Sequence, residues 1–361
     1  LWARLRPEDL RLAVRAALAE LMLSGCTTAA DHHYLYPAGL ENAVDIAVEE
    51  ARALGIRVTI SRGSMNLSQK DGGLPPDEVV QDEDTILADC ERVLGLFHDP
   101  KPGSMVQIAL APCSPFSVTT SLMAASAELA TRFDAPLHTH LAETQDEVRI
   151  VREKYAATPV EHLDALGMLD DKTIGAHCIH VTDSDIRTLA RRGVAVSHNP
   201  QSNMKISSGV APVEKMRAAG ALVTIGTDGT CSNNDLDMFE ELRTAAFLQK
   251  SATGDPVALP AYEALKLATV NGARAMGYAE GELGVIRPGA LADLIVVDLQ
   301  KPHLQPIHDL VSNLVYCGKA SDVDTVMVDG RIVVENRRVA GVDLPKLYAD
   351  VAAAVERITG R

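Results

Sequence analysis

The chain has 361 residues, of which 47% are hydrophobic, and its formal net charge at pH 7 is −15. This length and apolar content allow one large barrel domain or two ordinary domains, each with a sizeable core. The acidic residues are spread along the chain, which argues against nucleic-acid binding through clustered Lys and Arg, and no apolar stretch of about 18 residues is present to span a membrane.

The sequence alternates between predicted strands and predicted helices. Residues 7–23 carry apolar side chains at helical spacing, and Gly25 ends this first helix. Further helices are predicted over 38–54, 77–96, 119–133, 144–155, 159–167, 183–192, 212–219, 235–250 and 260–276. Strands are predicted over 26–31, 57–60, 106–111, 136–141, 173–177, 194–198 and 222–228.

This β-then-α order implies a parallel sheet with helical crossovers. Polar or metal-binding side chains stand at the carboxyl ends of the strands, namely His32, Arg62, Cys113, His140, His177, His198 and Asp228. Such an arrangement is typical of a (β/α)8 TIM-type barrel, whereas a doubly wound sheet would gather its ligand groups at a switch point. The eighth strand, the first of the barrel, is expected to precede Leu1 in a missing N-terminal segment.

The sequence pattern changes after the predicted helix over 260–276. Residues 1–280 are expected to form the barrel, 281–340 a small β unit, and 341–361 a terminal helical segment. Two β-rich runs flank Asp329-Gly330, a dipeptide that favours a hairpin. An earlier stretch, from Asn66 to Pro76, does not fit the alternation of strands and helices. This long loop is predicted to be either a lid over the site or a plain surface excursion.

The strand predicted over 136–141 ends in polar side chains. Its apolar residues alternate with His138 and His140, and Glu143 follows where the next helix should begin. An imidazole can bind a divalent metal, and a carboxylate close by can move a proton to or from a metal-bound water. The alternative is an ordinary strand-end histidine beside a solvated helix N-terminal glutamate.

His140, Glu143, His177 and Asp228 should face one barrel mouth, because each follows or ends a predicted strand. Two imidazoles and two carboxylates can hold a metal and its water. His198 is left open as a substrate group, a group supporting the site or a packing residue. The remaining histidines considered are interpreted as structural or surface residues, and they are His162, His180, His303 and His308.

Four motifs, read together, resemble the aminohydrolase branch of the amidohydrolase superfamily. They are Leu137-His-Thr-His-Leu-Ala-Glu143, Ala176-His-Cys-Ile-His180, Ser197-His-Asn-Pro-Gln-Ser-Asn-Met204 and Gly226-Thr-Asp-Gly229. The resemblance implies a distorted (β/α)8 barrel, a small β-sandwich and one divalent metal, zinc or iron. It also implies two further ligands from an H-x-H motif on the first strand, which is expected in the missing N-terminal segment.

The resemblance assigns roles to the strand-end residues. His140 would be a metal ligand, and Asp228 a metal ligand that also activates the water. Glu143 would protonate the ring nitrogen of the substrate and shuttle the proton, while His177 would hydrogen-bond the hydroxide on the metal. Cys113 and Arg62 are predicted to bind substrate together with Glu143 and His177.

Two substrate classes remain open. The segments around His32, Arg62 and Cys113 resemble 8-oxoguanine deaminases and the related hydroxyatrazine aminohydrolases, which favours an oxopurine. The segment 226–241 resembles methylthioadenosine/S-adenosylhomocysteine deaminases. A triazine or pterin aminohydrolase and a catalytically silent binding barrel are further alternatives.

Cellular context is predicted from composition. The six cysteines are far apart and form no C-x-x-C pair, so a reducing, cytoplasmic compartment is expected. The partner is expected to be a small-molecule substrate, with neither nucleic acid nor membrane involved. A homo-oligomer is left open.

Overall fold

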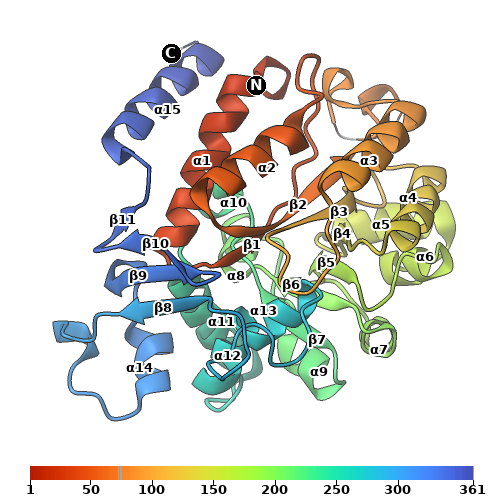
Figure 1. Cartoon of the computed structure of the whole chain (residues 1–361). Helices are drawn as coiled ribbons and strands as arrows, with labels where there is room; N and C mark the ends of the chain where they lie inside the picture. Colours follow the sequence, from red (N-terminus) through yellow and green to blue (C-terminus); the bar gives the residue numbers. More distant parts are fainter. Residues whose placement is uncertain (72, 74, 361) are drawn as a thin grey trace.

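Figure 1 shows the chain as a computed structural model, which describes residues 1–71, 73 and 75–360. Within these residues a seven-stranded sheet has the order β1-β2-β3-β4-β5-β6-β7, and every neighbouring pair is parallel. The strands are β1 (Thr28–Ala30), β2 (Arg57–Ser64), β3 (Val106–Pro112), β4 (Leu137–Leu141), β5 (Thr173–His177), β6 (Ala195–His198) and β7 (Leu222–Ile225). The predicted parallel α/β architecture is thereby confirmed.

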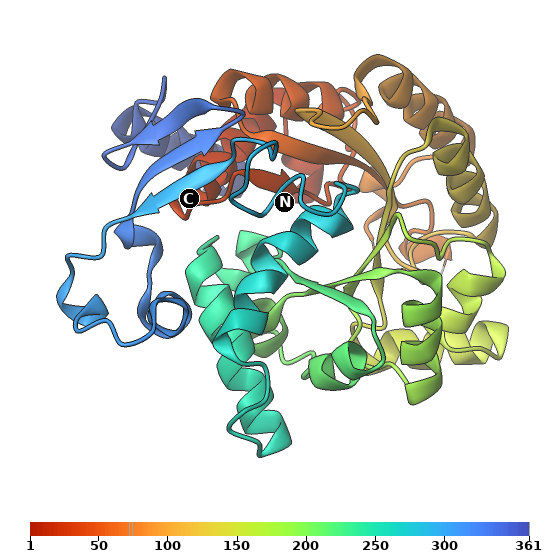
Figure 2. The same ribbon diagram turned by 60° about the horizontal axis from the view of Figure 1, so that its bottom comes forward.

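The sheet curls into a half-barrel, with helices along its outer face (Figure 2). All residues of β2 and β3 are buried, because helices cover one side and the curl encloses the other. The longer helices are α1 (Pro7–Leu23), α2 (Ala43–Leu54), α3 (Glu83–Phe97), α4 (Thr120–Phe133), α5 (Gln145–Tyr155), α7 (Asp183–Arg192) and α11 (Met238–Thr253). The shorter ones are α6 (Pro159–Ala165), α8 (Pro200–Lys205), α9 (Val213–Ala218), α10 (Thr230–Asn233), α12 (Ala261–Ala268) and α13 (Val270–Ala275).

The helices differ from the predictions in several places. Helices α2 and α3 begin at Ala43 and Glu83 rather than at 38 and 77. The helix expected over 260–276 is broken into α12 and α13 at Thr269, whose φ of −120° and ψ of −99° lie outside the helical region. Helix α8 was not predicted, although Pro200 at its first position is a favourable start. Because α8 follows β6 directly, it lies at the same edge of the sheet as the strand ends.

The small β unit is an antiparallel sheet with the order β11-β10-β9-β8, four strands in the part of the chain that the structure describes. Its elements are β8 (Leu294–Val297), α14 (Leu310–Cys317), β9 (Val323–Val328), β10 (Arg331–Glu335) and β11 (Arg338–Val339). Asp329 and Gly330 both have positive φ, 49° and 76°, as a tight two-residue hairpin requires. The predicted hairpin is confirmed.

A buried ion pair joins the two sheets. The Arg57 guanidinium on β2 donates to both carboxylate oxygens of Asp293, which precedes β8, at 3.1 and 3.0 Å. Neither side chain is more than 1% exposed. Each carboxylate oxygen accepts one guanidinium N–H, so both buried charges have a partner. The terminal helix α15 (Leu344–Thr359) returns to α1, where Arg357 pairs with Asp9.

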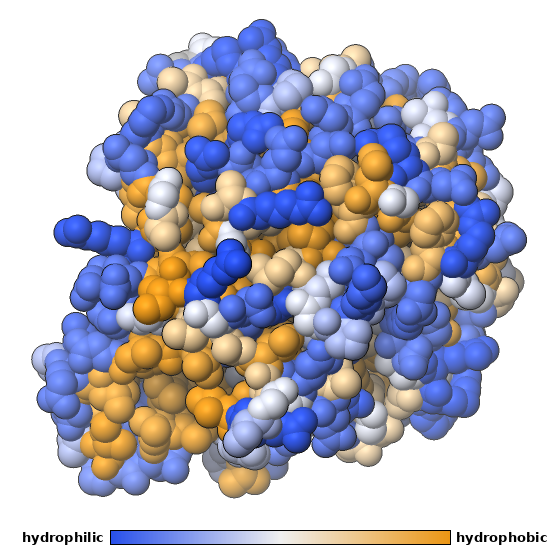
Figure 3. Space-filling model, viewed as in Figure 1, coloured by the Kyte–Doolittle hydropathy of each residue, from blue (hydrophilic) through white to orange (hydrophobic). Residues whose placement is uncertain are grey.

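Hydrophobic side chains are visible at the lower left of the molecule, around β8 and α14 (Figure 3). Val296 is 57% exposed and Leu310 is 46% exposed. The small unit is thus less completely covered than the parallel sheet. Among the described helices, none combines the length and the apolar character needed to cross a lipid bilayer.

The loop predicted as a lid begins close to β3. The backbone N–H groups of Asn66 and Leu67 donate to the carbonyl of Ser117 at 3.2 and 3.1 Å. Gly72 and Leu74, which belong to this loop, lie outside the described residues. The lid therefore stays a prediction.

Candidate active site

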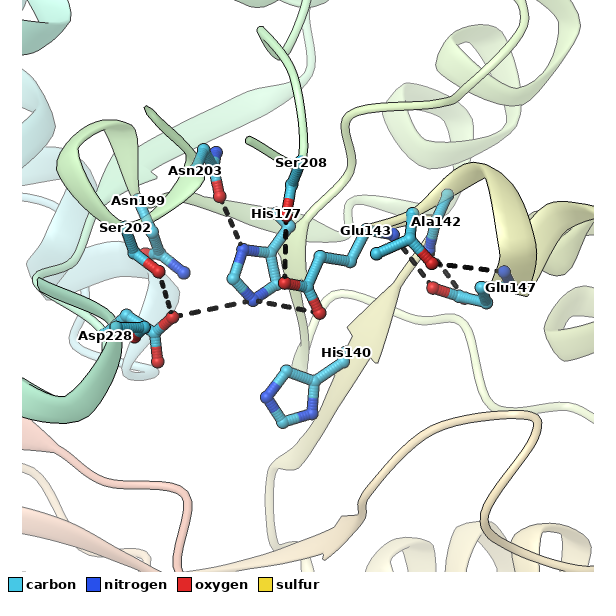
Figure 4. A network of polar contacts seen from close by, with 12 residues as sticks. His140, Ala142, Glu143, Glu147, His177, Asn199, Ser202, Asn203, Ser208 and Asp228 are labelled. Carbon is cyan, nitrogen blue, oxygen red and sulfur yellow. Dashed lines mark hydrogen bonds and ion pairs between the residues drawn. The ribbon is translucent and has the colours of Figure 1, made fainter. Parts of the chain in front are cut away.

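Three catalytic candidates meet at the carboxyl edge of the sheet (Figure 4). Glu143 lies in the turn between β4 and α5, His177 is the last residue of β5, and Asp228 follows β7. The His177 Nε2 atom is 3.9 Å from Glu143 Oε2 and 4.0 Å from Asp228 Oδ2. His140, on β4, has its ring centroid 5.5 Å from that of His177. The structure therefore brings together the four residues that the sequence singled out.

Backbone strain accompanies these strand ends. Ala142, His177, Cys178 and Asp228 have φ values of 50°, 71°, 48° and 59°. For a residue with a side chain, this left-handed region costs about 1 kcal/mol or more, and it is tolerated where the surroundings enforce it. The chain turns sharply at these positions, which directs the polar side chains into one space.

One segment, α8 with the turn that follows it, contacts three of the four site residues. Ser202 Oγ donates to Asp228 Oδ2 at 2.6 Å, and Asn203 Oδ1 lies 2.8 Å from His177 Nδ1. Further along, Ser208 Oγ donates to Glu143 Oε1 at 3.3 Å. These contacts fix the rotamers of residues that come from separate strands.

Hydrogen bonds at Nδ1 leave the Nε2 atoms of both imidazoles directed at the site. His177 Nδ1 donates to the side-chain amide oxygen of Asn203, Oδ1, so Nε2 carries the lone pair. Burial lowers the pKa of His177, which keeps the ring neutral at pH 7. His140 Nδ1 lies 2.8 Å from the carbonyl oxygen of Cys113, which anchors that ring in the same way.

Asp228 is an ionised carboxylate in this setting. Burial would raise its pKa, but the Ser202 hydroxyl, the His177 ring and the Gly229 N–H together hold the pKa below its usual value. The Nε2 atom of His177 and the carboxyl groups of Glu143 and Asp228 thus face one another (Figure 4). Mutual repulsion of such groups is relieved by a cation and the water that it polarises.

The donor atoms fit a divalent metal in kind. Imidazole Nε2 atoms fixed by carbonyl oxygens, next to a carboxylate, are the ligands and supports that zinc prefers. Within residues 1–71, 73 and 75–360, however, no three His, Cys, Asp or Glu side chains form a complete metal centre.

Cys113 lies beside His140, directly after β3. Its Sγ is 3.8 Å from His140 Nδ1, and the residue is 9% exposed. Its position next to the site agrees with the one expected for it, and contact with substrate stays a proposal.

Arg62 lies outside the site, contrary to the prediction. Its guanidinium is fully buried on the α3 side of β2, with Nε 2.5 Å from Asp89 Oδ2 and Nη2 2.8 Å from Gln81 Oε1. It also stacks on the Tyr36 ring at 3.8 Å. Because side chains alternate between the faces of a strand, a position near the strand end did not guarantee the inner face.

Arg62→Met should therefore destabilise the fold by about 3 kcal/mol, since it leaves the Asp89 carboxylate without its buried partner. Urea unfolding measures this loss. Arg92→Met is the matched control, because Arg92 pairs with the same Asp89 from the exposed side and should cost less than about 1 kcal/mol. If Arg62→Met instead raised KM and left the stability unchanged, Arg62 would belong to the substrate site.

His162 and His303 have structural surroundings, whereas the His32 ring stacks on that of His140 at a centroid distance of 4.4 Å. His162 stacks on Tyr155 at 3.9 Å, and His303 Nε2 is 2.8 Å from Asp322 Oδ2. His198 is fully buried, and burial followed by the nearby His177 ring lowers its pKa to about 3. Neither ring nitrogen of His198 has a hydrogen-bond partner among the described residues, so its role stays open.

Residues that the sequence did not single out include Ser202, Asn203, Ser208 and Glu147. The first two belong to a motif that was noticed, but nothing in the spacing indicated which strand end they reach. Glu147, in the first turn of α5, has the sequence signature of a solvated helix N-terminal acid. Tyr34 is a further neighbour, with its ring edge-on to His140 at a centroid distance of 6.0 Å.

Comparison with known proteins agrees with this geometry. The sequence matches the amidohydrolase family over residues 1–333. The chain belongs to the amidohydrolase family. The resemblance inferred from four motifs is thereby confirmed, and with it the prediction of a hydrolase.

Relatives within the amidohydrolase family include two kinds of purine deaminase. The chain is 46% identical to an 8-oxoguanine deaminase of Pseudomonas aeruginosa, over 99% of its own length and 79% of the relative's. It is 38% identical to a 5-methylthioadenosine/S-adenosylhomocysteine deaminase of Pelotomaculum thermopropionicum, over 99% and 77% of the two lengths. Both names match the two substrate classes that the sequence left open.

Solved amidohydrolase structures share the fold and bind zinc. An adenosine deaminase from Xanthomonas campestris with bound zinc has a TM-score of 0.90 and 32% identity, over 99% of this chain and 77% of the other. An atrazine chlorohydrolase from Arthrobacter aurescens complexed with zinc has a TM-score of 0.92 and 32% identity, over 98% and 78%. A divalent metal is thus a feature of these structural neighbours.

Proposed function

We propose that this amidohydrolase deaminates an amino-substituted N-heterocycle, an oxopurine such as 8-oxoguanine, with release of ammonia. The observation that carries the proposal is the convergence of two carboxylates on His177 Nε2, Glu143 at 3.9 Å and Asp228 at 4.0 Å. The relative at 46% identity, named an 8-oxoguanine deaminase, supports the choice of substrate.

The proposed metal is zinc, with iron as the alternative, held in part by His140 and Asp228. Such a metal lowers the pKa of a bound water and so supplies a nucleophile at neutral pH. Zinc in the solved neighbours supports this choice. His140 suits the role of ligand because its Nδ1 is anchored on the Cys113 carbonyl oxygen, which directs Nε2 inward.

The protein's own groups would move the protons. Asp228, ionised and fixed by Ser202, accepts a proton from the attacking water. Glu143, protonated when substrate binds, donates its proton to the ring nitrogen, and Asp228 passes the proton taken from water to the departing amine. As ammonia leaves, the added hydroxyl becomes the product carbonyl and returns its proton to Glu143. His177, neutral and fixed by Asn203, accepts a hydrogen bond from the water through Nε2 and so orients the attack.

A methylthioadenosine/S-adenosylhomocysteine deaminase is the second candidate, since relatives with that name are 35–41% identical. The argument for the oxopurine is the Cys113 thiol. A thiol is small and weakly polar, whereas a longer polar group at this position could reach a ribose or its substituent. A triazine or pterin would suit the same small pocket. A silent binding protein is disfavoured, because the proton-carrying groups are present and held by α8.

Kinetics with two substrates test the choice. For the zinc-loaded protein, we expect kcat/KM for 8-oxoguanine to exceed that for S-adenosylhomocysteine by about 100-fold or more. A site whose polar groups match the edge of one base leaves those groups unpaired when the other base binds. Cys113→His should narrow this ratio, and Cys317→Ser, at a thiol on α14, should leave it unchanged. A wild-type ratio below one would overturn the oxopurine assignment.

The wider organisation is proposed on the same basis. We infer that the half-barrel is part of a distorted (β/α)8 barrel, with residues 1–280 as barrel, 281–340 as part of a β-sandwich and 341–361 as a terminal helix. A cytoplasmic location and a small-molecule substrate as the partner are proposed from composition and family. Self-association, nucleic-acid binding and membrane binding are tested by light scattering, mobility shift and vesicle sedimentation.

A further inference from the structure

A second glutamate lies behind the proton-carrying Glu143. The Glu147 carboxylate accepts two backbone hydrogen bonds, from Ala142 N to Oε1 and from Glu143 N to Oε2, both at 2.8 Å. Its side chain points back from α5 to the turn that carries Glu143, on the side away from His177 (Figure 4). At 2% exposure, Glu147 has almost no access to solvent. The carboxylate thus binds the turn itself and not the Glu143 side chain.

The turn that Glu147 holds is strained and locked from its other side. Ala142 has a φ of 50°, a conformation that an alanine adopts only when its surroundings enforce it. The Ala142 carbonyl oxygen accepts the N–H groups of Ile179 and His180 at 3.0 and 2.9 Å. Because these two residues lie two and three positions after His177, the Glu143 turn and the His177 strand end form one hydrogen-bonded unit.

Only a group with two acceptor atoms satisfies this turn. A carboxylate offers an acceptor oxygen to each N–H, whereas the glutamine amide would present its own N–H₂ to one of them. Burying a carboxylate is costly, and burial raises the pKa of Glu147 to about 7 despite the two hydrogen bonds. A carboxyl group that accepts two backbone N–H groups at this buried place indicates a requirement for its geometry.

We propose that Glu147 is a positioning residue for the deamination, acting through Glu143. By holding the backbone N–H groups of Ala142 and Glu143, it sets the direction in which the Glu143 side chain leaves the turn and so its 3.9 Å separation from His177 Nε2. The inference rests on the proposed function, in which Glu143 carries the proton. Loss of Glu147 should therefore lower turnover more than substrate binding.

The experiment compares Glu147→Gln with Glu153→Gln, a matched change at an exposed glutamate of the same helix. In the zinc-loaded protein, E147Q should lower kcat by about 10- to 100-fold, as loss of an outer supporting group does elsewhere, with KM within about threefold. E153Q should leave both constants unchanged. Glu147→Asp keeps two acceptor oxygens and should give a kcat between those of wild type and E147Q.

A double-mutant cycle separates positioning from a general structural role. If Glu147 acts only through Glu143, adding E147Q to Glu143→Gln should change the residual kcat by less than about twofold, because contacting residues are non-additive. Rates are expressed per folded, metal-loaded molecule, so partial misfolding of E147Q is accounted for, and E147D supplies a second variant.

Three results would overturn the inference: an E147Q kcat within threefold of wild type, an equal loss in the E143Q background, or an E147D kcat no higher than that of E147Q. A failure of the proposed function looks different, because Glu143→Gln alone would then leave deamination intact. The two failures are therefore distinguished within one set of proteins.

Discussion

Glu143→Gln should lower kcat for deamination by about 10²- to 10⁴-fold while metal content and thermal stability stay at wild-type levels. The amide keeps the shape of the side chain and can still accept the Ser208 hydroxyl, but it cannot donate a proton to the ring nitrogen. Ammonia release in the steady state measures the loss, and metal analysis of the same sample shows that the site is retained.

Asp146→Asn is the matched control for this change. Asp146 lies three residues further along the chain, and its side chain is 82% exposed at the start of α5. It should turn over as fast as wild type. If Glu143→Gln stayed within tenfold of wild type, Glu143 would have no part in proton transfer.

Asp228→Ala should abolish both activity and metal binding. We expect kcat to fall by about 10⁴-fold, because one carboxylate serves as water-activating base and as ligand. Removing it also leaves the Ser202 hydroxyl and the Gly229 N–H without their acceptor. Metal stoichiometry after reloading a chelated sample, measured beside kcat, tests both parts.

Ser202→Ala provides the comparison for Asp228. It removes the 2.6 Å hydrogen bond but keeps the carboxylate, so metal should remain bound while kcat falls by about 10- to 100-fold. Full metal occupancy in Asp228→Ala would show that Asp228 is not a ligand, and wild-type turnover would remove it from catalysis altogether.

Much of the site could be predicted from the sequence, because parallel strands end at one edge. His140 and His177 each sit at the last positions of a short apolar strand, and Asp228 stands between glycines after another. Sheet topology then brings such residues together without any knowledge of side-chain contacts. The order and parallel pairing of the strands followed from the same alternation.

The failures have a different physical origin. Arg62 stands at a strand end too, but which face a side chain takes depends on the local register, and here the α3 carboxylate Asp89 captures it. Helix α8 is six residues long, too short for a periodic pattern to be recognised. Glu147 has the sequence signature of a solvated acid, and only the three-dimensional fold shows that the β4–α5 turn encloses it.

The distribution of the site over the sheet bears on how such enzymes diversify. Glu143, His177 and Asp228 come from β4, β5 and β7 and are hydrogen-bonded to α8 and the turn after it, whereas Cys113 and the 66–76 loop follow β3 and β2. On the proposed roles, the proton-carrying groups lie in the later stretch of chain, and the contact proposed to select the ring, Cys113, lies in the earlier one. Mutations can accumulate in the early loops and explore new ring systems while the proton-carrying machinery is inherited intact. A fold shared at 32% identity with enzymes named for adenosine and for atrazine is the expected outcome of such a history.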